Sequence, residues 1–341
     1  MRTLTLRELN RATLARQLLL AREPLAVGAA LERLAGLQAQ ESKAPYIGFR
    51  ARLAGFERAE LEEALLSRAA VRAVLMRNTI HLVTLADYRL MSAALYGDDA
   101  SPLPPGALAL GRRFATRTRA FVGTTPRTRA ELMSWFATTH GFEEAPLHWY
   151  ALRACADIVH APETGLWKGK RPCFVALDEA PAPDPAAARA ELVRRYLAAF
   201  GPATVADIGA WAGLRIRDVR LAVAAAEPFE RYADERGREL LDLPGAPLPA
   251  AETPAPARLL PRWDNVILAH ADRARIIPPA YRQAMSLVGG ADYQCFLVDG
   301  FVGGRWRLER GKVVLEPFAP LSKPAQRELA GEAAALEAFL R

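Results

Sequence analysis

The chain carries TRAELMSW at residues 128–135 and a related stretch, TVADIGAW, at residues 204–211. Each stretch opens with Thr and places an acidic residue three positions later, which is the pattern of a capping box at the start of a helix. The apolar residues that follow, including the Trp, then share one helix face that can pack into a core. TLREL at residues 5–9 is a weaker copy. The repeat predicts equivalent helical units along the chain.

A second helix and a hairpin follow each of the two strong copies. The apolar spacing predicts helices at 147–156 and 217–226, and strand pairs at 158–160 with 167–177 and at 229–232 with 239–243. The first hundred residues follow the same pattern, with helices at 6–20, 27–37, 58–67 and 85–96, and a hairpin from 71–76 to 80–84 that turns at Arg77-Asn78. Helix, turn, helix and hairpin is the order typical of a winged helix-turn-helix.

The C-terminal residues have a different texture. Apolar runs at 295–298, 301–308 and 313–318 are separated by Asp299-Gly300 and Arg310-Gly311, which predict tight hairpin turns, and a helix at 324–340 follows. We therefore expect an α+β fold of three tandem winged helix-turn-helix units with a C-terminal antiparallel β region and a terminal helix. Pro-rich linkers at 101–105, 180–185 and 243–256 divide the chain into 1–105, 106–183, 184–248 and 249–341.

The composition is that of a globular protein. Of the 341 residues, 51% are hydrophobic and 24% are charged, which excludes collagen-like and wholly disordered chains. No stretch approaches the ~18 uncharged apolar residues that a membrane span requires. We therefore expect a cytoplasmic, nucleoid-associated monomer with no membrane partner. The net charge of +7 favours a polyanionic partner such as a nucleic acid.

Several catalytic classes lack their signatures here. The sequence contains no G-x-x-x-x-G-K-[ST], no G-x-S-x-G and no H-E-x-x-H. The five histidines show no metal-ligand spacing, and the three cysteines show no C-x-x-C pair, so we interpret them as core or surface residues. We expect neither a metal ion nor a nucleotide cofactor.

Gln38 and Gln40 lie two residues apart, where the apolar pattern of a helix stops. On a continuous helix, residues two apart diverge by roughly 200°, whereas an extended backbone places them on one side. If both side chains serve one pocket, the helix must end before Gln38.

Gln38-Ala39-Gln40 and the KAPYIG that follows resemble the Gln-apolar-Gln motif of the winged-helix alkylpurine DNA glycosylases that include AlkZ, whose close relatives of the YcaQ type carry Gln-apolar-Asp. RNTIHLVT at 77–84 and LPRWDNVIL at 260–268 are similar to that family too, so the resemblance spans nearly the whole chain. It implies a monofunctional DNA glycosylase that removes N7-alkylated purines from duplex DNA and, in some members, unhooks interstrand crosslinks. It also implies that Gln38 and Gln40 carry catalysis.

The chemistry fits neutral amides. An N7-alkylated purine is cationic and leaves as a neutral base, so it needs no general acid. The site must then hold a water and stabilise positive charge on the sugar; a Gln carbonyl can position water but is a poor base. Glu41 either supplies negative charge or is a solvated helix-end carboxylate. Lys43 would act in a lyase only with a depressed pKa, for which the sequence gives no evidence.

We expect DNA contacts from basic residues and their neighbours in all three units and the C-terminal hairpin. These are Lys43, Arg77, His81, Lys168, Lys170, Arg171, Arg215, Arg217, Arg220, Arg305 and Trp306. The hairpin at 298–307 is the candidate groove probe, with a sheet-core Trp306 as the alternative. Any one basic cluster is equally consistent with a solvated face.

Two other classes remain open. A non-catalytic winged-helix regulator would prefer one undamaged sequence and release no base. A protein-interaction scaffold would show no salt-sensitive DNA binding.

Overall fold

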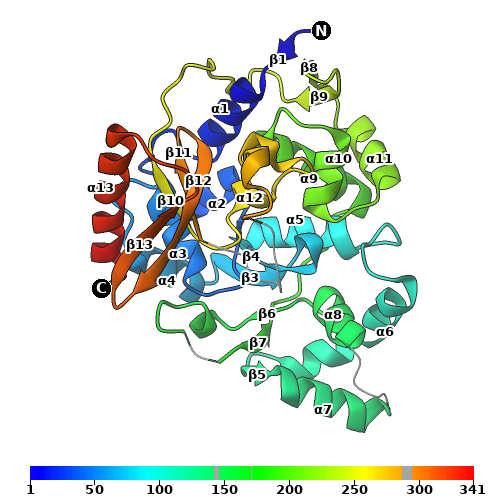
Figure 1. Ribbon diagram of the computed structural model, residues 1–341. Coiled ribbons are helices and arrows are strands. Elements are labelled where there is room, and N and C mark those ends of the chain that lie inside the picture. The colour runs from blue at the N-terminus through cyan, green and yellow to red at the C-terminus, as the bar shows by residue number, and fades with distance from the viewer. Residues whose placement is uncertain (142–145, 170, 286–293) are drawn as a thin grey trace.

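The computed structural model describes residues 1–141, 146–169, 171–285 and 294–341 (Figure 1). One order of elements, two helices followed by two strands, occurs in three successive segments, and in the first two segments a further strand precedes the helices. In the first segment these elements are β2 (Leu37–Gln38), α3 (Ala44–Arg52), α4 (Arg58–Leu66), β3 (Ala70–Val74) and β4 (Ile80–Thr84). They form an antiparallel sheet of order β2-β4-β3, with α2 (Val27–Leu34) before it and α5 (Leu85–Tyr96) after it.

The second segment repeats this arrangement after α6 (Pro105–Val122). Its elements are β5 (Arg127–Thr128), α7 (Arg129–His140), α8 (Pro146–Cys155), β6 (Ile158–His160) and β7 (Cys173–Ala176). The sheet order is β5-β7-β6, which is equivalent to that of the first segment. The strand predicted at 167–177 is shorter than expected, because residues 162–169 form a 3₁₀ turn and a loop before it.

The third segment follows α9 (Pro185–Phe200). Its elements are α10 (Val205–Ala212), α11 (Ile216–Ala226), β8 (Glu230–Asp234) and β9 (Glu239–Asp242), and a single bridge from Ala203 to Leu241 replaces the first strand. β1 (Thr3–Leu4), from the start of the chain, pairs in parallel with β8. No local pattern in the sequence predicts this pairing.

The capping boxes that carry the repeat are all present. Thr128 with Glu131, Thr204 with Asp207, and Thr5 with Glu8 each cap a helix reciprocally; the last pair begins α1 (Leu6–Arg16). Two predicted helices end earlier than expected, because Leu18 follows α1 and Ala35 follows α2 in the left-handed backbone region, at φ 56° and 54°.

The C-terminal residues form the predicted antiparallel sheet and helix. The sheet has the order β10-β11-β12-β13, built from β10 (Arg258–Leu260), β11 (Cys295–Val298), β12 (Phe301–Glu309) and β13 (Lys312–Pro317). α12 (Asn265–Leu268) follows β10, and α13 (Lys323–Leu340) packs against the sheet (Figure 1). The turns at Asp299-Gly300 and Arg310-Gly311 are confirmed, both in the left-handed region.

The main core joins the segments. Side chains of α5, α9, α10 and α11 pack together, with Tyr88, Tyr196 and Trp211 among its large members. α9 contacts α5, α11 and α1, so it joins helices of the first and third segments. In the described ranges, no helix is both long and apolar enough to cross a bilayer.

Candidate functional site

The helix has ended before the Gln motif, and the backbone is extended at Leu37 and Gln38. α2 ends at Leu34, and Gly36 turns the chain at φ +81°, where a Cβ would lie 2.6 Å from Val83 Cγ1. β2 then pairs with β4, so that Gln38 lies opposite His81, and the Ala39 amide donates to the Ile80 carbonyl at 2.8 Å. The expectation that the helix ends before Gln38 is confirmed.

Hydrogen bonds fix both carboxamides through their oxygens. Gln38 is 7% exposed, and its Oε1 accepts from Arg77 Nη2 at 3.2 Å. Gln40 is exposed, and its Oε1 accepts from the Ile80 backbone amide at 2.9 Å. Because each oxygen has a second lone pair, both can still accept a bond from water.

Two further donors hold the backbone at and just before the motif. The Asn265 amide group donates to the Gly36 carbonyl at 2.5 Å, and Arg72 Nη2 donates to the Ala39 carbonyl at 2.8 Å. Arg72 Nη1 also donates to the Thr164 carbonyl at 2.9 Å, which ties the motif to the second segment. Burial lowers the pKa of Arg72 to about 10, so it remains a cation at neutral pH.

Residues of the string at 260–268 contact the segments on both sides of the motif. Asp264 forms a fully buried ion pair with Arg52, with N to O distances of 2.7 and 2.8 Å. Asn265, the next residue, is the donor to Gly36 described above. Asp264 and Asn265, from one of the strings that carry the family resemblance, thus have structural roles next to the motif. Arg52, Arg72 and Asn265 are therefore added to the site. Arg72 could have been suspected as a lone charge inside the apolar strand at 70–74.

Glu41 and Lys43 lie just after the motif. Glu41 pairs with Arg262 at 2.8 Å, and both side chains are partly exposed, so Glu41 is neither free nor buried. The Lys43 ammonium is exposed and lies 4.7 Å from the centre of the Trp167 ring. Both residues border a cavity of about 160 Å³ beside the C-terminal sheet.

His81 does not face solvent. Its side chain is buried, and burial, followed by the charge of Arg77, lowers its pKa to about 3, so the ring is neutral near pH 7. Nδ1 lies 3.0 Å from the Thr79 carbonyl oxygen and must therefore carry the proton. The predicted DNA contact of His81 is corrected: this ring packs inside the first sheet.

Trp306 and Arg305 are also turned toward protein. Trp306 is 3% exposed, and its indole N–H donates to the Leu260 carbonyl at 2.9 Å. This corrects its predicted place in a groove probe and supports the alternative of a sheet-core tryptophan. The Arg305 guanidinium donates to the Ala284 carbonyl and lies over the Phe318 ring, so its polar end is engaged within the protein.

The remaining predicted cations lie on the surface. Arg215 and Arg217 flank the start of α11 and both pair with Asp218, at 2.7 and 3.4 Å, whereas Arg220 is exposed one turn further on. Lys168 and Arg171 are exposed in the loop before β7. Lys170 lies outside the described residues.

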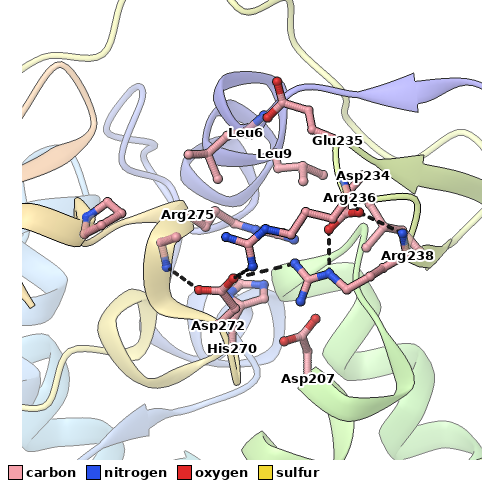
Figure 2. Close-up of a pocket in the computed structure, with 13 residues that line it drawn as sticks. Leu6, Leu9, Asp207, Asp234, Glu235, Arg236, Arg238, His270, Asp272 and Arg275 are labelled. Atoms are coloured by element: carbon pink, nitrogen blue, oxygen red, sulfur yellow. Dashed lines mark hydrogen bonds and ion pairs between the residues drawn. The ribbon is translucent and has the colours of Figure 1, made fainter.

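A separate charged pocket of about 130 Å³ lies between the start of α1, the turn after β8 and residues 270–275 (Figure 2). Its carboxylates and guanidinium groups neutralise one another: Arg236 and Arg238 reach Asp272 at 3.0 and 3.6 Å, and Arg238 also reaches Asp234 at 2.6 Å. These ion pairs therefore link the hairpin β8–β9 of the third segment to the C-terminal region. Neither Gln38 nor Gln40 lines it.

Comparison with known proteins bears on the fold and the family. Among solved structures, the chain resembles the Streptomyces sahachiroi DNA glycosylase AlkZ with a TM-score of 0.83 at 20% identity, over 99% of this chain and 97% of that one. Comparison with curated proteins gives no match. A family model described as DNA glycosylase AlkZ-like matches residues 31–339. The chain therefore belongs to the AlkZ-like DNA glycosylase family.

Proposed function

We propose that this protein hydrolyses the N-glycosidic bond of cationic N7-alkylpurines in duplex DNA. The observation that carries the proposal is the pair of carboxamides, Gln38 at the end of β2 and Gln40 in the bend that follows it, with their oxygens held by fixed donors. The arrangement supplies acceptors for a water molecule but no strong base. Such a site suits only a leaving group that is already activated, and the positive charge of an N7-alkylpurine provides that activation.

The proposed step is simple in its bonds. The bond between the anomeric carbon and purine N9 breaks, its electron pair neutralises the cationic base, and positive charge develops on the sugar. A water held by the second lone pairs of the Gln oxygens then adds to the anomeric carbon and loses a proton to solvent. The enzyme is monofunctional in this proposal, because the Lys43 ammonium lies over Trp167 and is not assigned to the sugar. No metal ion or nucleotide cofactor enters the step.

The surrounding fold is assigned to DNA binding. In this proposal residues 1–105, 106–183 and 184–248 are winged helix-turn-helix units, residues 249–341 are the C-terminal region, and the protein acts as a monomer. The repeated order of strand, helix pair and hairpin supports that assignment. Arg217 and Arg220 on α11 are the proposed phosphate contacts of the third unit, and Lys168 and Arg171 those of the second.

The exposure of Gln40 bears on substrate size. Its carboxamide lies at the surface and not at the bottom of an enclosed cavity. A site of this kind can meet a lesion that stays outside the protein, so bulky adducts and interstrand crosslinks belong to the proposed substrate range.

The test is release of 7-methylguanine from a duplex, followed by hot-alkali cleavage to reveal abasic sites. We expect release at equal rates with and without a chelator, and none from the same duplex without the lesion. Affinity should fall linearly with salt on logarithmic axes. Tight binding to one undamaged sequence without base release would support the regulator instead, and salt-insensitive or absent DNA binding would support the scaffold.

A further inference from the structure

Arg77 connects the Gln motif to the third segment through one planar group. Its Nη2 donates to Gln38 Oε1 at 3.2 Å, and its Nη1 donates to the Trp211 carbonyl, at the end of α10, at 2.6 Å. The side chain is partly buried, and burial, followed by the nearby charge of Arg273, lowers its pKa to about 10. The sequence suggested a DNA contact for Arg77, but both terminal nitrogens are bound within the protein.

The backbone around Arg77 is held in an uncommon shape. Arg77 and Asn78 have φ values of 53° and 58°, the left-handed region in which hairpin turns usually place Asn and Gly. Gly213, which ends α10, packs against this turn so closely that a Cβ there would lie 3.1 Å from the Arg77 amide nitrogen. The position of the guanidinium is therefore set by two contacting backbones as well as by its own bonds.

We propose that Arg77 is a positioning residue for base release, acting through Gln38. The guanidinium fixes the Gln38 oxygen, so that its second lone pair keeps one direction toward water. Because the same guanidinium binds the Trp211 carbonyl, that direction also depends on how α10 packs against the first hairpin. Only a planar fork can make both contacts at once, because a Lys ammonium is a point donor on a flexible stem. This inference rests on the proposed function.

The decisive experiment is a double-mutant cycle in single-turnover release of 7-methylguanine at saturating enzyme. The variants are Arg77→Met, Arg77→Lys, Gln38→Ala and the double variant Arg77→Met with Gln38→Ala. We expect Arg77→Met to slow release at least tenfold with duplex affinity changed less than twofold, and Arg77→Lys to recover part of the rate. In the Gln38→Ala background, Arg77→Met should slow release less than twofold, because Arg77 then has nothing to position.

Arg231→Met is the matched control, because Arg231 lies in the equivalent hairpin of the third segment and is exposed. It should leave the release rate unchanged. A full additional loss from Arg77→Met in the Gln38→Ala background would overturn the inference, as would a loss of duplex affinity that matches the loss of rate. If Arg77→Met does not fold, the same cycle with Arg77→Lys decides the question.

A second readout does not depend on activity. The side-chain amide signals of Gln38 and Gln40 can be followed by ¹⁵N NMR in the wild type and in Arg77→Lys. We expect the Gln38 signal to move and the Gln40 signal to stay, since Gln40 is held by the Ile80 amide. An unmoved Gln38 signal would overturn the inference. If the wild type released no base at all, the proposed function would fail, and this measurement would still judge the contact between Arg77 and Gln38.

Discussion

The hairpins β3–β4 and β8–β9 occupy equivalent places in the first and third segments, yet their arginines face opposite environments. All five residues of β3 are buried, and Arg72 on that strand is 6% exposed. β8 begins with exposed residues, and the Arg231 side chain is 44% exposed. The strand order is the same in both hairpins, so the difference comes from what packs over each one.

The partners of these arginines differ in the same way. Arg72 donates to backbone carbonyls of Ala39 and Thr164, which cannot reach water in its absence. Arg231 pairs with Glu227 and Glu239, whose carboxylates are solvated without it. Exposed pairs of this kind contribute little to stability, whereas a buried acceptor that loses its donor is costly. Arg72 therefore holds the site from inside the first hairpin, whereas Arg231 lies on the exposed part of β8.

The largest difference is expected in catalysis. Replacing both Gln38 and Gln40 with Ala should slow release of 7-methylguanine on the order of 1,000-fold, because the water loses both acceptors. The paired control, Arg231→Ala with Glu239→Ala in the third hairpin, should leave the rate unchanged. Duplex affinity should be retained in both cases. Unchanged release by the Gln variant would remove the catalytic assignment altogether.

The next difference is in stability. Arg72→Met should lower the free energy of unfolding by about 2 to 4 kcal/mol, because two buried carbonyl groups lose their donor. Arg231→Met should change it by less than about 0.5 kcal/mol. Urea unfolding of both variants measures the contrast. Equal effects at the two positions would show that burial does not distinguish the hairpins.

A smaller effect follows from the buried imidazole of the first hairpin. The folded-state pKa of His81 is lowered to about 3, whereas the unfolded value is about 6.5. Between these values the unfolded chain binds more protons, so stability rises with pH and is lost as pH falls below 6.5. Between pH 6.5 and 5, the free energy of unfolding of His81→Asn should fall by about 2 kcal/mol less than that of the wild type. If the free energy of unfolding changed equally with pH in the wild type and in His81→Asn, the buried neutral state of His81 would be contradicted.

The smallest effect concerns DNA affinity. Arg220→Ala on α11 should weaken duplex binding a few-fold and reduce the salt slope by about 1, because one phosphate contact is lost. The release rate at saturating enzyme should not change. Arg310→Ala, at the exposed turn between β12 and β13, is the control cation outside the proposed contacts. A salt slope that is the same in wild type and Arg220→Ala would remove α11 from the interface.

The sequence predicted the capped helices, the C-terminal sheet and the place of the Gln motif, but not α3, α6 or α9. The capping boxes at Thr128 and Thr204, the turn at Arg77-Asn78 and the end of the helix before Gln38 all agree with the structure. Each of these features depends on residues within a few positions of one another. The long-range features were not predictable in this way, among them the pairing of β1 with β8.

The predicted roles of side chains show the same difference between local and long-range features. Arg77, His81 and Trp306 were expected at the DNA because of their types, but the structure turns all three toward protein. A residue's type shows which bonds it can make, and its local sequence shows which element carries it. The direction it faces depends on the segment packed above it, which comes from more than 100 positions away for Arg77 and Trp211. The sequence alone determined the capped helices and the tight turns, because short-range hydrogen bonds and apolar periodicity set them. Only the tertiary structure decided which arginines hold that motif, because burial and partner choice arise when distant segments meet.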